Sequence, residues 1–268
     1  MGRTRRTRWL VVVVVAVVAA ACEYDPADVA DWPVLSECNG VPATIGLGWV
    51  EGDGPDGASY EGTEGDDVVV ILNGPVTFDG LGGDDLICVN ATSASWGSSA
   101  LVVVHGGAGD DAVHNHTDHS VLAYLGDGDD AYHGGGGRDL VAPGAGADTV
   151  AAGAGDDVVW GSGHEPGETV DCGGDGRAAE LSSGDLYLTA AHHPTGVVAC
   201  EIVESGGHVG DPILVASAAV LEAAATDSAN ADRSVVLRPG SYELAERMRM
   251  PDGLRLLSAT GASGTIID

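Results

Sequence analysis

Lysine is absent from this 268-residue chain, and basic residues are scarce altogether. Eleven arginines stand against 41 aspartates and glutamates, which gives a formal net charge of −30. Four of the arginines lie within the first eight residues, so the remainder of the chain is more acidic still. Binding to a nucleic-acid backbone requires clustered Lys and Arg, and docking on anionic lipid requires the same. The composition therefore argues against both classes of partner.

Large aromatic side chains are also few, with one Phe, six Tyr and five Trp. Glycine accounts for 42 residues and proline for 11. This composition argues against a packed helical enzyme and against a coiled coil. An acidic, glycine-rich chain can fold when something neutralises its carboxylates, and a divalent cation is the obvious candidate.

One long apolar run, LVVVVVAVVAAA at residues 10–21, follows the basic start RTRRTRW. Twelve apolar residues are short for a membrane span, which takes about 20. We therefore expect residues 1–21 to be a secretory signal peptide, followed by a tether over 22–40. Cys22 after three alanines resembles a bacterial lipoprotein box, which implies lipidation of Cys22 in a secreted or cell-surface lipoprotein of a bacterium. The alternatives are ordinary cleavage after Ala21 and a membrane-anchor helix.

A nine-residue repeat dominates the middle of the chain. Residues 125–160 divide without a gap into LGDGDDAYH, GGGGRDLVA, PGAGADTVA and AGAGDDVVW, and the same frame recurs at 62–70, 80–88 and 106–114. All seven repeats have Asp at position six: Asp67, Asp85, Asp111, Asp130, Asp139, Asp148 and Asp157. The four contiguous repeats have Gly at positions two and four: Gly126, Gly128, Gly135, Gly137, Gly144, Gly146, Gly153 and Gly155.

These residue types suit a turn that holds a cation. Glycine permits a tight turn with backbone carbonyls aimed at an ion, and Asp supplies a short, hard oxygen ligand of the kind that Ca²⁺ prefers. The residues around position eight predict a short strand whose central apolar side chain points inward. Two repeats close one coil, so we expect repeats 18 residues apart to stack: 125 on 143, 134 on 152, and 62 on 80. The repeats at 106 and 125 are 19 apart and could stack as well.

The pattern resembles the nonapeptide GGxGxDxUx of repeats-in-toxin (haemolysin-type) calcium-binding proteins, which build a parallel β-roll. The resemblance implies an all-β fold, with a β-roll over 41–205 that binds Ca²⁺ through the aspartates and glycines named above. The export signal is N-terminal here, so toxin activity does not carry over. The expected function is an exported calcium-binding protein with a structural or surface-interaction role. The alternative is a Gly/Asp-rich solenoid or linker without metal.

Several segments depart from the repeat. Residues 71–79 keep the length but have Val76 where Asp belongs, and residues 89–105 and 115–124 predict loops or metal-free coils. Arg138 replaces a position-five Asp and is expected near an ion. Asp139 and Asp148 occupy interior repeats and should bind an ion directly, whereas Asp118 and Asp185 lie outside the frame.

Four cysteines remain after Cys22, and four cysteines allow three pairings. Export places them where disulfides persist. We favour Cys38 with Cys88 and Cys172 with Cys200, because each pair would bracket one end of the repeat region.

The composition changes near residue 207, where the Gly-Asp frame ends. Residues 216–226 predict a helix whose apolar face contains Val220, Leu221 and Ala224. Short strands are expected after it, in the order 234–237, 241–244, 254–258 and 265–268. This order over 206–268 resembles the N-terminal start of pectin lyase-like right-handed parallel β-helix proteins. It implies an alternative function, as the non-catalytic N-terminal part of a secreted polysaccharide lyase or hydrolase.

No catalytic motif is found, and we assign no catalytic residue. Carbohydrate is a partner that only the β-helix resemblance suggests. His114, His116 and His119 lie close together in sequence, and His114 and His133 both occupy position nine of a repeat, so they could align on one outer face. This cluster is either a Zn²⁺ or Cu²⁺ site or a set of solvated surface histidines.

Overall fold

The computed structural model describes these parts of the chain: residues 37–47, 58–72, 75–90, 101–161, 167–173, 186–189, 196–204, 211–244, 250–252, 254–259 and 265–267. The expected signal peptide, Cys22, most of the expected tether and Asp185 lie outside the described residues.

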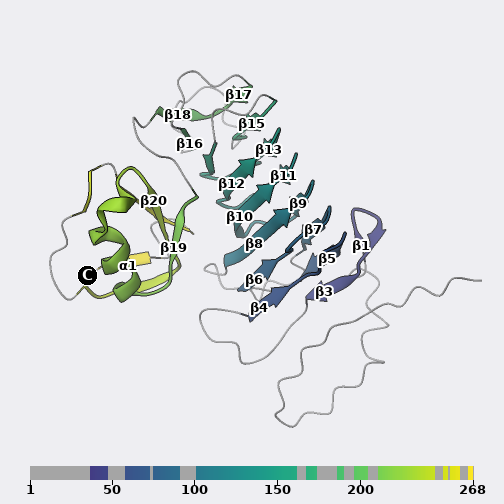
Figure 1. The fold of residues 1–268 in the computed structure, drawn as a ribbon, viewed down its shortest axis with the longest axis horizontal. Helices are drawn as coiled ribbons and strands as arrows, with labels where there is room; N and C mark the ends of the chain where they lie inside the picture. Colours follow the sequence, from purple (N-terminus) through teal and green to yellow (C-terminus); the bar gives the residue numbers. More distant parts are fainter. Residues whose placement is uncertain are drawn as a thin grey trace, which may run out of the picture.

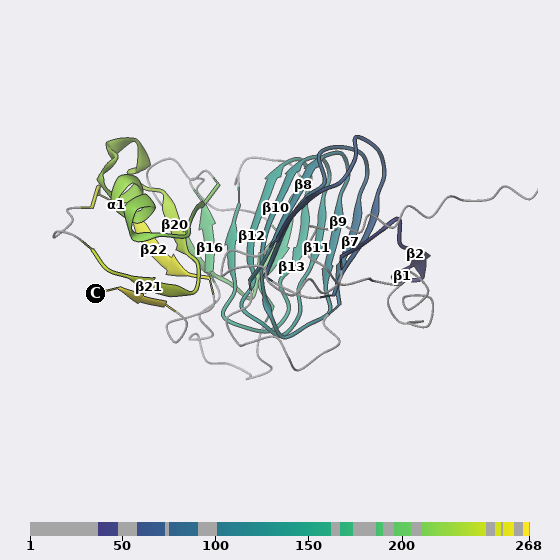
Figure 2. The ribbon, with the colours of Figure 1, turned by 90° about the horizontal axis from the view of Figure 1, so that it is seen from below.

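The fold is all-β, apart from short helical segments, and two eight-stranded parallel sheets dominate it (Figure 1). The odd sheet contains, in spatial order, β3 (Ile45–Leu47), β5 (Val68–Ile71), β7 (Leu86–Val89), β9 (Ala112–Asn115), β11 (Ala131–His133), β13 (Thr149–Ala151), β15 (Thr169–Asp171) and β17 (Val197–Val198). The even sheet contains β4 (Ala58–Glu61), β6 (Val76–Asp79), β8 (Leu101–Ala108), β10 (Ser120–Asp127), β12 (Leu140–Ala145), β14 (Val158–Trp160), β16 (Leu186–Thr189) and β18 (Glu201–Glu204). Successive strands alternate between the sheets, so each pair of strands makes one coil (Figure 2).

The strand register explains the core between the sheets. Position eight of each repeat pairs with position eight of the next coil, as Tyr132 does with Val113 and Val150 in the odd sheet. Val141 and Val159 are paired in the same way in the even sheet. These side chains are buried in one continuous apolar cluster. The expectation that position eight points inward is confirmed at all seven repeats, namely Val69, Ile87, Val113, Tyr132, Val141, Val150 and Val159.

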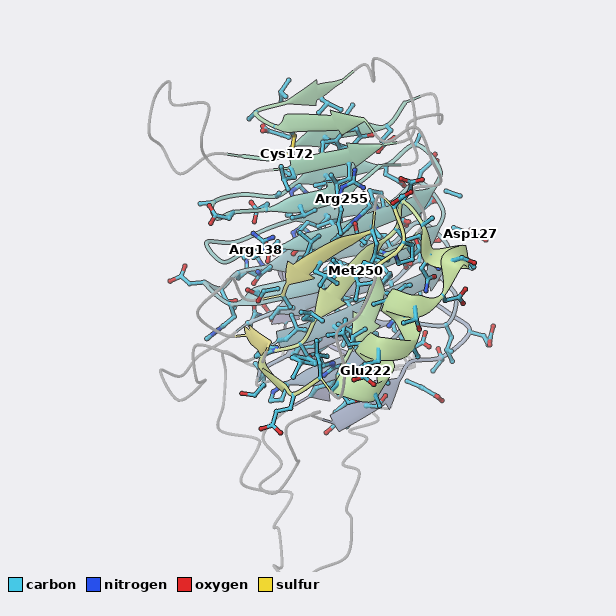
Figure 3. The ribbon with its side chains drawn as sticks, turned by 90° about the vertical axis from the view of Figure 1, so that its left-hand side faces the viewer. Asp127, Arg138, Cys172, Glu222, Met250 and Arg255 are labelled. Carbon is cyan, nitrogen blue, oxygen red and sulfur yellow. A yellow bond between two sulfur atoms is a disulfide. The ribbon has the colours of Figure 1, made fainter. Side chains whose placement is uncertain are left out.

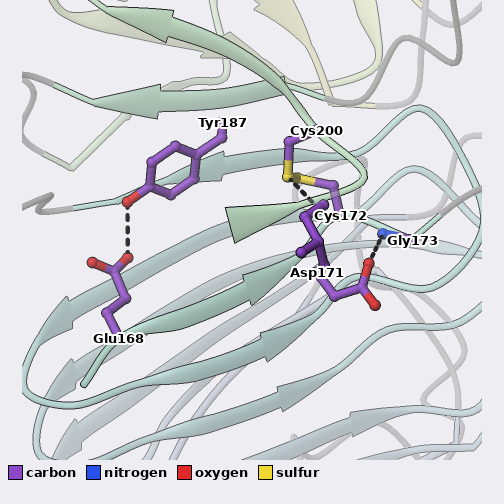
Figure 4. The surroundings of a disulfide bond; sticks show 7 residues. Glu168, Asp171, Cys172, Gly173, Tyr187 and Cys200 are labelled. Carbon is purple, nitrogen blue, oxygen red and sulfur yellow. Dashed lines mark hydrogen bonds between the residues drawn. A yellow bond between two sulfur atoms is a disulfide. The ribbon is translucent and has the colours of Figure 1, made fainter. Parts of the chain in front are cut away.

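Both favoured disulfides are present in the structure. The hairpin of β1 (Glu37–Cys38) and β2 (Val41–Pro42) is tied to β7 by the Cys38–Cys88 bridge, and both sulfurs belong to buried residues. The Cys172–Cys200 bridge joins the last coils, beside the hydrogen bond from Tyr187 to Glu168 (Figure 4). Bridges that close loops of this length stabilise a protein by about 3–4 kcal/mol according to chain-entropy arguments.

A smaller unit follows the two sheets. It contains β19 (Ile213–Val215), α1 (Ala218–Thr226), the 3₁₀ turn η1 (Ser228–Asn230), β20 (Ser234–Leu237), β21 (Gly240–Tyr242), β22 (Arg255–Ser258) and β23 (Thr265–Ile267). Strands β19, β20 and β22 form a parallel sheet, and β21 pairs in parallel with β23.

Several details of this unit differ from the sequence prediction. The helix starts at Ala218 because Ser217 caps it, accepting a hydrogen bond from the Val220 N–H. Leu221 and Ala224 are buried as expected, but Val220 is 47% exposed and Ala225 takes the inward place. Strand β19 was not predicted, and β21 spans Gly240–Tyr242 rather than 241–244.

The smaller unit packs on the outer face of the even sheet. Val236 and Ala259 join an apolar cluster with Leu101, Leu122 and Leu140 of that sheet. The Tyr124 hydroxyl also donates to the Pro212 carbonyl at 3.0 Å. In the described part of the chain, no helix has the length and apolar character needed to cross a membrane.

Candidate metal centre

The turns between the sheets lie along two edges. The first edge consists of turns that lead from an even strand to the next odd strand, and it carries Asp67, Asp85, Asp111, Asp130 and Asp148. The second edge consists of turns that lead from an odd strand to the next even strand, and it carries Asp139 and Asp157. All seven aspartates are buried, with at most 6% of each residue exposed.

The first-edge aspartates form a ladder through the stacked coils. The backbone N–H of Asp67 donates to Oδ1 of Asp85, and that of Asp85 donates to Oδ1 of Asp111, both at 2.8 Å. The N–H of Asp111 donates to Asp130 at 2.8 Å, and the N–H of Asp130 donates to Asp148 at 3.0 Å. One oxygen of each carboxylate is therefore committed to holding the neighbouring coil in register.

The other carboxylate oxygen is open at the middle of this ladder. Oδ2 of Asp85, Asp111 and Asp130 is buried and has no hydrogen-bond partner in the described residues. A side chain at Gly80 would collide with Oδ2 of Asp85, and one at Gly106 would collide with Oδ2 of Asp111. Buried carboxylate oxygens are normally hydrogen-bonded or bound to a metal. These three oxygens are therefore candidate metal ligands.

Burial disfavours the charged form of these groups. It raises the pKa of Asp85 and Asp130 to about 7 and the pKa of Asp111 to about 6, while the backbone hydrogen bonds and nearby carboxylates act as smaller influences. Without a cation, Asp85, Asp111 and Asp130 therefore retain protons at a higher pH than an ordinary Asp does. A bound cation would remove this cost by supplying the missing positive charge.

A second row of carboxylates runs outside the first. The N–H of Asp84 donates to Oδ1 of Asp66 at 3.1 Å, the N–H of Asp110 to Asp84 at 3.0 Å, and the N–H of Asp129 to Asp110 at 2.9 Å. These position-five residues are exposed. In the inner row the earlier coil donates to the later one, and in this outer row the later coil donates to the earlier one. The two rows together fix the spacing of the first-edge turns.

Glycine allows the turns to approach one another closely. Gly128 and Gly146 have φ of +154° and +144°, a backbone conformation that other residues rarely adopt. A side chain at Gly146 would also collide with the carbonyl oxygen of Gly128 in the preceding coil. Backbone carbonyls and buried carboxylates are thereby brought together between neighbouring turns.

Asp139 on the second edge differs in its hydrogen bonding from Asp85, Asp111 and Asp130. Oδ1 of Asp139 accepts from the Val121 N–H at 3.0 Å, and Oδ2 accepts from the Gly135 N–H at 3.2 Å. The side-chain amide of Asn115, in the preceding coil, lies 3.1 Å from Oδ1 and 3.3 Å from Oδ2. The N–H of Asp139 donates in turn to Asp157 at 2.8 Å. Burial raises the pKa of Asp139 to about 7 as well. Both oxygens of Asp139 are therefore already partnered by this chain.

The first edge fits a calcium ion in its donor chemistry. Ca²⁺ takes six to eight oxygens, and backbone carbonyls serve as well as carboxylates. In the described residues, no group of three or more His, Cys, Asp or Glu is placed to hold a metal ion. A site here would thus draw one or two carboxylates from the ladder and its remaining oxygens from the backbone.

All of the predicted stacking is confirmed. Tyr132 pairs with Val150, Val141 with Val159, and Val69 with Ile87, in agreement with an 18-residue spacing, and the pairing of 106 with 125 is present too. Sequence reasoning missed the stacking of the repeats at 80 and 106, which closes the gap in the first-edge ladder. Residues 101–105 and 120–124 form strands, which agrees with the predicted coils and not with the loops given as the alternative. The repeats that start at residues 80 and 106 are 26 residues apart, so a search for a fixed 18-residue period does not pair them.

Arg138 contacts the smaller unit, and its expected place near an ion stays a prediction. Its Nε donates to the Ser258 carbonyl at 3.1 Å, and Nη1 donates to the Asp156 carbonyl at 2.6 Å. Figure 3 shows Arg138 beside the strands of the smaller unit. The guanidinium therefore links the repeats to β22.

No protein family matches the sequence, and neither a curated protein nor a solved structure is significantly similar to the chain.

Proposed function

We propose that this chain is an exported calcium-binding β-roll protein with a structural or surface-interaction role. The observation that carries the proposal is the buried first-edge ladder, in which Asp85, Asp111 and Asp130 each keep one oxygen without a protein partner. The two-sheet parallel fold and the Gly-Asp repeat, which resembles repeats-in-toxin proteins, support the same proposal.

The residues that would hold the ions follow from this arrangement. The first-edge aspartates supply carboxylate oxygens, and the glycines at positions two and four allow backbone oxygens to approach from the neighbouring turn. Bound calcium would supply positive charge to a segment in which Arg138 is the only basic residue among 29 acidic residues between 23 and 176. Without it, like charges repel and little apolar area offsets the entropy of ordering the chain.

Circular dichroism of the exported chain, with and without Ca²⁺, tests this function. We expect β structure to increase as Ca²⁺ rises through about 10⁻⁴–10⁻³ M, the range typical of extracellular modules. Mg²⁺ at the same concentration is the matched control, because it demands a stricter six-coordinate geometry. Identical spectra in chelator and in Ca²⁺ would contradict the proposal.

The smaller unit favours a second candidate function. Its parallel pairing of β19, β20 and β22, with a short helix between β19 and β20, agrees with the start of a parallel β-helix. On this reading, the described region is the non-catalytic N-terminal part of a secreted polysaccharide lyase or hydrolase. Sequencing the gene beyond codon 268 separates the two candidates. A continuation with regularly spaced short strands supports the second, and a stop codon supports the first.

A further inference from the structure

Three histidines gather on the outer face of the odd sheet, away from the aspartate ladders. His114 in β9 and His133 in β11 are in register, so they stand side by side on neighbouring parallel strands. His116 follows β9, and its N–H donates to the Val89 carbonyl at 3.0 Å, which continues the parallel pairing. Because alternate residues of a strand point to the same face, His116 lies on the same face as His114.

The three rings are close to one another. The ring centre of His114 is 4.7 Å from that of His133 and 5.8 Å from that of His116, and the planes differ by 10° and 6°. His116 and His133 are exposed, whereas His114 is half-buried between them. Nε2 of His116 lies 3.8 Å from Sγ of Cys88, so the Cys38–Cys88 disulfide borders the cluster.

The charge of the chain favours cations near this cluster. Metal binds the neutral form of histidine. The net charge of −30 raises the local concentration of cations around the whole chain.

We infer that His114, His116 and His133 form a tri-imidazole site for a divalent transition ion of the Zn²⁺ class. Two histidines spaced i and i+2 on one strand and a third on the adjacent strand bring three nitrogens to one face of a sheet. Zn²⁺ binds three imidazoles readily and keeps a fourth position open to water. Ca²⁺ prefers oxygen, so this site and the aspartate ladder select different metals.

As placed, the three stacked rings do not converge on one point, so binding requires a rearrangement of their side chains. Ligand nitrogens around a tetrahedral zinc lie about 3.3 Å apart, which follows from Zn–N bonds of about 2.0–2.1 Å. The rings of His114 and His133 are nearly parallel at 4.7 Å, so they must tilt toward a common point. His116 and His133 are exposed and free to change rotamer on a fast timescale. The backbone already holds the three Cβ atoms on one face.

A stack of solvated surface histidines is the competing explanation, and substitution with phenylalanine separates the two. His133→Phe keeps an aromatic ring against His114 but removes the nitrogen lone pairs. His119→Ala is the matched control, because His119 lies in the following turn, outside the ring contacts. Both substitutions remove one imidazole from the same region of the molecule.

The experiment is calorimetric titration of the exported chain with Zn²⁺ at saturating Ca²⁺, together with NMR of the histidine rings. We expect one Zn²⁺ per chain, with shifts confined to the rings of His114, His116 and His133. His133→Phe should weaken binding by at least about tenfold, and His119→Ala by less than about twofold. The thermal midpoint in Ca²⁺ shows whether each variant is folded.

His116→Ala, at an exposed position, provides a second test that should also weaken binding at least tenfold. Two results would overturn the inference: no stoichiometric Zn²⁺ binding by the unsubstituted chain, or equal Zn²⁺ affinity in His133→Phe and the unsubstituted chain. Neither result bears on calcium binding, because the aspartate ladder uses none of these side chains.

Discussion

Asp130 on the first edge and Asp139 on the second edge occupy the same position of the repeat but lie in different environments. On the first edge, Asp130 accepts one backbone hydrogen bond on Oδ1, and its Oδ2 is left open. On the second edge, Asp139 is saturated by Val121, Gly135 and Asn115. A backbone N–H of the preceding coil, from Asp111 or from Val121, serves both aspartates, and the difference lies in the additional donors from Asn115 and Gly135 to Asp139. If calcium binds as proposed, the repeat of Asp130 should therefore be a better cation site than the repeat of Asp139.

Removal of calcium should produce the largest difference between the two edges, in the rate at which their amides exchange with solvent. We expect the first-edge amides of Asp67, Asp85 and Asp111 to exchange with solvent much faster in chelator than in Ca²⁺, because their acceptors then face one another without a counter-charge. The second-edge amides of Val121 and Gly135 should change less. Hydrogen exchange read by NMR or mass spectrometry measures both. Equal deprotection of the two edges would remove the distinction between them.

Removal of the Asp139 carboxylate should destabilise the fold more than removal of the Asp130 carboxylate. Asp139→Ala leaves three hydrogen-bond donors without their carboxylate acceptor in a buried site. Each such donor costs about 1–3 kcal/mol. Asp130→Ala leaves one donor, the Asp111 N–H, without its acceptor. Denaturant unfolding in chelator should therefore show a larger loss for Asp139→Ala. A larger loss for Asp130→Ala would contradict the hydrogen-bond assignment.

Conversion of Asn115 to Asp should make the second edge resemble the first. The substitution keeps the oxygen that accepts from Thr117 but replaces the amide that donates to Asp139. In chelator we expect a loss of about 1–3 kcal/mol, and in Ca²⁺ a gain in the number or affinity of bound ions. Ala147→Asp adds the same charge at a position-five site and serves as the control. Equal calcium titrations for the two variants would show that charge alone matters.

Stability without calcium should fall as the pH rises. The folded-state pKa of Asp85, Asp111, Asp130 and Asp139 is raised from 3.8 to about 6–7. Between about pH 4 and 7 the folded state therefore holds more protons than the unfolded state. The free energy of unfolding in chelator should be highest below about pH 4, as far as these four groups determine it, and should be lost toward pH 7. Excess Ca²⁺ should oppose this trend, because the ion competes with protons for the same oxygens.

The sequence predicted the elements that depend on local pattern. The strands around position eight, their inward side chains and the 18-residue stacking follow directly from the repeat. The continuous first-edge ladder was not predictable, because the segment between Ile87 and Val113 interrupts the period while the strands still pair. The roles of Asn115 and Arg138 also escaped sequence reasoning, since each depends on a partner in another coil or in the smaller unit. The exposure of Val220 depends on packing against the neighbouring strands, which a helical pattern does not specify.

The most direct test of the account is calorimetric titration of Ca²⁺ into Asp130→Ala and Asp118→Ala, beside the unsubstituted chain. Each variant loses one negative charge, but Asp130 lies in the buried ladder and Asp118 is exposed outside the repeat frame. Asp130→Ala should lower the affinity or the number of bound ions. Asp118→Ala should leave the titration nearly unchanged, as is usual for exposed positions. Equal weakening in both variants would mean that calcium acts only as a diffuse counterion, which would contradict a site built from the ladder.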